Sequence, residues 1–137
     1  MGHDQDEIIA ACEKYWEADK TDCSHFVRDV ANELGVFLQG NANSIVDQIN
    51  KAPWHPLSSG VEAAHKAVNK NVLVIGGLKA DGHGHVVVVV SGPLTHGKYP
   101  MAYWGSIAGV GRKNEPVTWS WTHKDLENVI YSYIQIR

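Results

Sequence analysis

The sequence has little of what marks several classes of protein. Its two cysteines, Cys12 and Cys23, allow at most one disulfide, so a disulfide-stapled secreted scaffold is excluded. The chain has no run of Lys or Arg and a formal net charge of -3, which argues against nucleic acid as a partner. Its longest apolar run, Val86–Val90, is far too short to span a bilayer and predicts a buried strand. We therefore expect neither nucleic-acid binding nor membrane insertion.

The start of the chain also lacks the pattern of a secretory signal. Residues Met1–Glu7 are polar and acidic, whereas a signal peptide needs a basic start followed by an apolar stretch. We therefore expect no Sec export.

The composition is that of an ordinary globular chain, with 44% hydrophobic and 20% charged residues. A length of 137 residues is enough to bury a core and too short to divide comfortably in two. We expect residues 1–137 to form a single domain.

Helical periodicity dominates the first half of the sequence. An amphipathic helix is predicted over roughly Gln5–Ala18, with Cys12 as an inert packing thiol on its apolar face. A second helix begins with Thr21 or Asp22 as its N-cap and stops at Gly35. Two shorter helices are expected, one leading into Ile45–Ile49 and one over Gly60–Asn69, on either side of a rigid loop at Pro53–Pro56.

The second half changes to the pattern of strands. Four β-branched and aromatic stretches predict strands, at Asn71–Ile75, His85–Val90, Tyr99–Trp104 and Asn128–Ile136. We expect a turn at Ser91–Pro93 and a short capped turn over Thr122–Glu127. Helices followed by strands predict an α+β fold, with the N-terminal helices packed on an antiparallel β-sheet.

Cys23 is the candidate nucleophile. It falls in the first turn of the second predicted helix, where free backbone N–H groups and the positive end of the helix dipole favour a thiolate. The N–H and hydroxyl of Ser24, with the N–H of Cys23, are candidate donors to an oxyanion, although Ser24 fits equally well as an ordinary residue of a helix start.

The candidate base lies at the start of a predicted strand, in the sequence Gly82–Val86. This stretch offers two imidazoles, His83 and His85, at the period-two spacing that puts both on one face of a strand. We assign His85 as general base. His83 is either an exposed loop residue or a second group that contacts substrate.

These residues resemble known motifs. Asp22–Val27, D-C-S-H-F-V, is similar to the D-C-S-G-F-V nucleophile motif of the NlpC/P60 cell-wall peptidases, and Gly84-His85-Val86 is similar to their histidine motif. The resemblance implies a papain-like fold with Cys23 and His85 as the catalytic pair. Two positions depart from the pattern: His25 stands where glycine is usual, and Ala102–Trp104 differs from the family before the Gly105-Ser106 turn.

Further segments resemble the amidase effectors that bacterial type VI secretion systems inject: Gly40–Asn43, Gly60–Ala64, Ser91–Leu94, Lys98–Met101 and Gly105–Gly109. The first family of these effectors cuts the peptidoglycan stem between γ-D-glutamate and meso-diaminopimelate. The resemblance thus implies a cysteine amidase acting on peptidoglycan, delivered to the periplasm of target cells. It also implies a cognate immunity protein that occludes the cleft, and no cofactor.

The sequence leaves several points open. The group that orients His85 is expected on the next strand, as the Trp104 carbonyl or the Ser106 hydroxyl. A zinc site from His83 and His85 with His123 or His25 lacks the usual ligand spacing, so we assign no metal. Alternative functions are cleavage of the diaminopimelate to D-alanine cross-link, a phage or housekeeping cell-wall hydrolase, and an inactive wall-binding domain.

Overall fold

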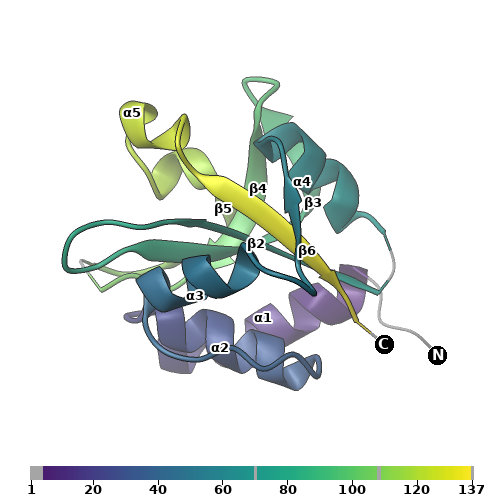
Figure 1. Ribbon diagram of the computed structural model, residues 1–137, viewed down its shortest axis with the longest axis vertical. Coiled ribbons are helices and arrows are strands. Elements are labelled where there is room, and N and C mark those ends of the chain that lie inside the picture. Colours follow the sequence, from purple (N-terminus) through teal and green to yellow (C-terminus); the bar gives the residue numbers. More distant parts are fainter. Residues whose placement is uncertain (1–4, 70, 108, 137) are drawn as a thin grey trace.

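The computed structural model describes residues 5–69, 71–107 and 109–136. Residues 1–4 of the acidic start that argued against a secretory signal lie outside these ranges. Helices come first and strands later along the chain (Figure 1). The elements are α1 Gln5–Asp19, α2 Cys23–Glu33, α3 Ala42–Ile49, β1 His55–Leu57, α4 Gly60–Ala67, β2 Val72–Leu78, β3 His85–Thr95, β4 Tyr99–Trp104, β5 Arg112–Pro116, the 3-10 turn η1 Val117–Trp119, α5 His123–Leu126 and β6 Ile130–Gln135.

The six strands form an antiparallel sheet in the order β1-β6-β2-β3-β4-β5. This arrangement confirms the predicted α+β class with an antiparallel sheet. Within the described ranges, no helix combines the length and the apolar character needed to cross a bilayer. Cys12 and Cys23 are both buried, free thiols.

The central strand β3 is buried on both faces because the sheet is covered on both sides. Val86, Val88 and Val90 point to a core shared with α1, α2 and α3. The alternate residues Val87 and Val89 point to a second core under α4 and the chain around Trp121. Figure 1 shows α1–α3 together on one side of the sheet. The continuous valine run follows from this sandwiching, since a strand with two buried faces needs no polar alternation.

Two predicted boundaries were wrong. The strand β3 runs on through Ser91–Pro93, where a turn was expected, and its pairing with β4 shifts register between Val90 and Thr95, so the chain reverses only at 96–98. In the loop expected at Pro53–Pro56, the structure has the short strand β1 paired with β6. The strand β5 was not predicted, because its residues Arg112–Pro116 are polar and mostly exposed.

The end of α1 is fastened to the loop that follows β4. The Lys20 carbonyl accepts hydrogen bonds from the backbone N–H groups of Ser106 (3.0 Å) and Gly111 (2.8 Å). The Trp16 indole donates to the carbonyls of Trp104 and Arg112, each at 3.1 Å. A Cβ at Gly105 would overlap the backbone of the α1–α2 turn, so this close approach requires glycine. The turn before Cys23 is thus held in place by the β4–β5 segment.

Replacing Cys12 tests the packing of α1. Cys12 has no exposed surface and lies in the core beneath the sheet. Cys12→Ala should therefore lower the free energy of unfolding by about 1 kcal/mol, the cost of deleting one buried heavy atom with incomplete relaxation. Urea denaturation measures this change. The matched control is Val68→Ala at a 61% exposed position, which should change stability far less; equal effects would contradict the packing described.

Candidate active site

The first turn of α2 is built around the side chain of Asp22. Asp22 is the N-cap, and its carboxylate accepts from the His25 N–H (3.1 Å) and from the Ser24 hydroxyl (2.9 Å). These bonds satisfy donors that a helix start leaves free. They place Cys23 as the first residue of α2, with its side chain only 2% exposed. Of the two caps considered from the sequence, the structure selects Asp22.

His85 opens β3, as the sequence pattern predicted. The preceding Gly84 allows a close approach of α3, because a Cβ there would collide with the side-chain oxygen of Asn43. The Asn43 side chain also makes two hydrogen bonds with Ala80: its Nδ2 donates to the Ala80 carbonyl, and its Oδ1 accepts from the Ala80 N–H. The loop leading to His85 is thereby fixed on α3.

A cavity of about 310 Å³ brings the predicted residues together. It is lined by Cys23 from α2, His83 and His85 from the start of β3, and Trp104 and Ser106 from the end of β4. Ser24 is not among its lining residues, and its hydroxyl donates to the Asp22 carboxylate. His83 is exposed at the mouth, which suits contact with a bound molecule.

Backbone N–H groups from α2 and from the strand of the base act on the nucleophile. The N–H groups of Val86, the residue after His85, and of Ser24 and Cys23 favour the Cys23 thiolate and act to lower the pKa of the thiol. Burial nevertheless dominates and raises the pKa of the Cys23 thiol, while these donors oppose the rise. The sequence argument for a thiolate considered the helix end alone, and burial of Cys23 outweighs that effect.

Burial acts on His85 in the opposite direction and lowers its pKa to about 4. Its Nε2 atom is buried and hydrogen-bonds to no described residue. The ring lies edge-on to Trp121, with 5.1 Å between centroids, and to Trp104 at 6.4 Å. At neutral pH the site therefore pairs a thiol with a neutral imidazole that is free to accept a proton.

One of the two groups expected to orient His85, the Trp104 carbonyl, has another partner in the structure. The strands β3 and β4 pair Val88 with Tyr103. If the same register continued, His85 would lie opposite Ser106, but β4 ends at Trp104. The Trp104 carbonyl accepts from the Trp16 indole. The ring contacts with Trp104 and Trp121 are the interactions that restrict the His85 ring among the described residues.

Sequence reasoning missed part of the cavity wall. Its further lining residues are Gly84, Ile107, Val110, Arg112, Trp119 and Ser120. Trp119 was expected to pack in the core or sheet, yet it is 60% exposed. Ile107 and Val110 are also exposed. Isolated apolar residues between glycines or polar residues show no periodicity, and only their clustering in space marks them as a surface.

A separate polar cluster lies where His25 replaces the usual glycine. His25 lies between Asp19 (3.7 Å) and Asp29 (3.4 Å), and these three are the described residues that could together hold a cation. The histidine sets considered from the sequence for zinc are not brought together in this way. Burial, followed by a hydrogen bond with Asp29, raises the pKa of Asp19 to about 6.

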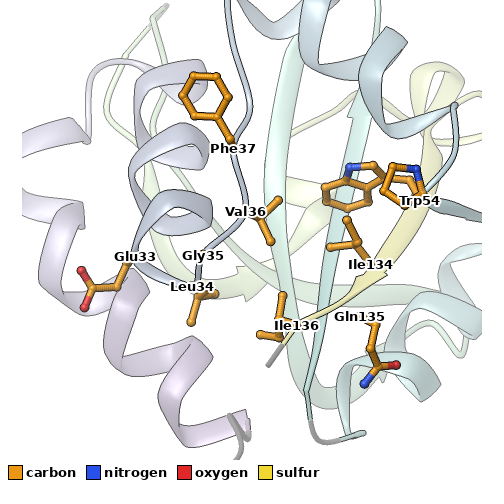
Figure 2. A pocket seen from close by; sticks show the side chains of 10 residues that line it. Glu33, Leu34, Gly35, Val36, Phe37, Trp54, Ile134, Gln135 and Ile136 are labelled. Atoms are coloured by element: carbon orange, nitrogen blue, oxygen red, sulfur yellow. The ribbon is translucent and has the colours of Figure 1, made fainter.

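A larger cavity, of about 570 Å³, lies away from these groups (Figure 2). It lies between the end of α2 and β6, and Val36, Trp54 and Ile134 form its apolar wall. Its ionisable residue is Glu33, whose carboxylate is occupied by Lys14 and Tyr15. Because it holds no thiol or imidazole, the smaller cavity is the candidate active site.

The raised pKa of Cys23 gives a test of this electrostatic picture. The rate of Cys23 alkylation by iodoacetamide should rise about tenfold per pH unit from pH 6 into the alkaline range, as the thiolate fraction does below a thiol's pKa. Mass spectrometry of peptides quantifies the two cysteines separately. Cys12, whose pKa burial raises well above its ordinary value, serves as the internal control and should stay unmodified in the folded protein. A rate at Cys23 that is constant between pH 6 and 7 would indicate a preformed thiolate and contradict this account.

Comparison with known proteins places the chain in a family. No protein-family model matches it. It is 45% identical over 139 aligned positions to a curated protein of Pseudomonas aeruginosa, the peptidoglycan amidase Tse1, an alignment that covers 91% of this chain and 89% of that protein. Identity at this level over nearly the full length of both chains confirms the resemblance to the peptidoglycan amidase effectors of type VI secretion. The chain belongs to the family of the peptidoglycan amidase Tse1.

Proposed function

We propose that this chain is a peptidoglycan amidase in which Cys23 is the nucleophile and His85 the general base. One observation carries the proposal: Cys23 at the start of α2 and His85 at the start of β3 line the same cavity, in a chain 45% identical to a peptidoglycan amidase. The order of helix and strand is the one that the NlpC/P60 resemblance implies. We infer a papain-like arrangement within a single domain over residues 1–137.

Acylation begins from the neutral pair. The Cys23 sulfur attacks the scissile carbonyl carbon, a sulfur–carbon bond forms, and the thiol proton passes to His85. The carbonyl oxygen becomes an oxyanion, and the proposed donors that stabilise it are the N–H groups of Cys23 and Ser24 at the helix start. When the intermediate collapses, the carbon–nitrogen bond breaks and His85 gives its proton to the departing amine.

Deacylation uses the same base. His85 takes a proton from water, whose oxygen attacks the thioester carbon, and collapse of the second intermediate breaks the sulfur–carbon bond. The products are a carboxylic acid and an amine, and the Cys23 thiol recovers its proton from His85. Every step uses side chains and backbone groups of the chain, so we propose no cofactor. Trp104 and Ser106 are the proposed orienting and cleft residues.

The proposed bond is the amide between γ-D-glutamate and meso-diaminopimelate in the peptide stem. It follows from the resemblance to the first family of type VI amidase effectors, not from the cavity alone. We propose that the chain is made in the bacterial cytoplasm and delivered by the type VI machinery into the periplasm of target cells. A cognate immunity protein that occludes the cavity of Cys23 and His85 would protect the producing cell.

Substitution of the pair tests the mechanism. Cys23→Ala should abolish release of fragments from purified peptidoglycan because no acyl-enzyme can form, and His85→Ala should lower turnover by about 10²–10⁴-fold. Mass spectrometry of the released muropeptides should show cleavage at the γ-D-glutamyl bond. His83→Ala is the matched control at the neighbouring imidazole and should cost much less.

Each other outcome has a distinct meaning. Fragments cut only at the diaminopimelate to D-alanine cross-link would keep the enzyme class and change the bond. Equal losses in His83→Ala and His85→Ala, with circular dichroism showing both variants folded, would overturn the assignment of His85 as sole base. Binding of peptidoglycan without any release of fragments by the unmodified chain would favour an inactive wall-binding domain.

Toxicity should depend on the compartment, because the substrate lies outside the cytoplasmic membrane. The chain expressed in the cytoplasm of a Gram-negative cell should be tolerated, whereas the same chain fused to a Sec signal should lyse the cell. Turbidity after induction measures the effect. The Sec-fused Cys23→Ala and His85→Ala variants are the controls and should be harmless. Equal toxicity from the cytoplasm would point to an intracellular target and refute the cell-wall proposal.

A further inference from the structure

The charge of the active-site cavity is one-sided. Among the described residues that line it, Arg112 is the one with a permanent charge, and no carboxylate lines the cavity. The rest of its wall is aromatic, aliphatic, imidazole, hydroxyl or thiol. A single fixed positive charge in a cavity with partly apolar walls makes the local electrostatic potential positive. The cavity therefore attracts an anionic group of a bound molecule.

The Arg112 side chain is held in place on this wall. Its guanidinium carbon lies 4.3 Å from the centre of the Trp119 ring, and Trp119 lines the same cavity. The Arg112 backbone is fixed through the Trp16 indole and through pairing with Trp104. Stacking on an aromatic face uses the flat side of a guanidinium and leaves the N–H groups at its edge available.

Among the residues that the structure describes, those N–H groups of Arg112 form no ion pair with a carboxylate. Its neighbour Lys113, by contrast, pairs with Glu13 at 2.9 Å on α1. Two adjacent cations on β5 are therefore used differently: Lys113 fastens the strand, and Arg112 is left to meet a bound group.

We propose that Arg112, stacked on Trp119, recognises a carboxylate of the substrate next to the scissile amide. The inference rests on the proposed function and adds a specificity-determining residue to it. A γ-linked glutamate keeps a free α-carboxylate on the acyl side of the bond. A meso-diaminopimelate residue, which has two carboxyl groups, keeps a carboxylate on the amine side. A guanidinium fork matches the two oxygens of either group.

The test uses three synthetic stem peptides with the same scissile amide. One has all its carboxylates free, one has a carboxamide on the acyl side, and one has a carboxamide on the amine side. The wild-type chain should cleave one of the two carboxamide peptides with a kcat/KM about 10–100-fold lower than that for the peptide with free carboxylates. This is the range for a hydrogen bond between charged groups. Which peptide suffers identifies the side that Arg112 contacts.

Substitution ties the preference to Arg112. The Arg112→Gln variant should no longer distinguish the peptides. It should cleave all three at about the rate at which the wild-type chain cleaves its poorer carboxamide peptide, and the loss should come mainly from a higher KM. Arg112→Lys keeps the charge without the fork and should fall between. The matched control Lys51→Gln removes one positive charge at an exposed position outside the cavity and should behave as wild type.

Binding to the Cys23→Ala chain separates this inference from the proposed function. Calorimetry should show the acid peptide binding about 10–100-fold tighter than its carboxamide, and the difference should vanish in Cys23→Ala/Arg112→Gln. Arg112-dependent binding without hydrolysis by wild type would sustain the recognition and refute the amidase. Equal binding of acid and carboxamide peptides, or an equal loss on all three peptides in Arg112→Gln, would overturn the role of Arg112.

Discussion

The active site depends on the contact between the first turn of α2 and the first residues of β3. The Val86 N–H acts to lower the pKa of the Cys23 thiol, and His85 is the residue before Val86, so the two members of the pair meet where the start of α2 faces the start of β3. Both sides of the contact are supported from behind. The Asp22 cap fixes the helix start, and the sheet holds Val86 opposite Gly77 of β2. A pair far apart in sequence thereby meets on rigid elements, as precise catalytic geometry requires.

Burial decides which protonation state the pair adopts. A helix N-terminus favours a nearby negative charge by about 0.3–1 kcal/mol at an exposed site. The lowering of the His85 pKa from 6.5 to about 4 corresponds to roughly 3 kcal/mol against the charged form. Burial is thus the larger effect, and a thiol–imidazole pair is favoured over an ion pair until substrate brings new polar groups. General-base transfer during attack, rather than a standing thiolate, is consistent with these magnitudes.

The sequence was sufficient for the parts of the fold that follow a period or a cap. The helical spacing before Cys23 and the valine run after His85 predicted their elements because buried faces impose regular patterns. The strand β5 and the wall formed by Arg112 and Trp119 obey no such pattern. They are exposed, and their neighbours are set by how β4, β5 and the turn η1 fold back over the start of β3, which no local rule encodes. Long-range packing also explains why β3 extends past the turn predicted at Ser91–Pro93, because its pairing with β4 resumes at Thr95 beyond the register shift.

The two departures from the family motif differ in what they can do to substrate. The His25 ring lies between Asp19 and Asp29 and is absent from the residues that line the cavity, so the change from glycine adds an imidazole at the helix start without narrowing the cavity. In the second departure, Tyr103 directs its hydroxyl to Glu13 on α1, at 2.7 Å, and also leaves the cavity unchanged. Trp104 alone of these positions lies in the wall and contacts His85. Differences in substrate choice within this family should therefore arise from Trp104 and the Arg112–Trp119 side of the cavity, while the helix start that bears Cys23 can vary at His25 without changing what binds.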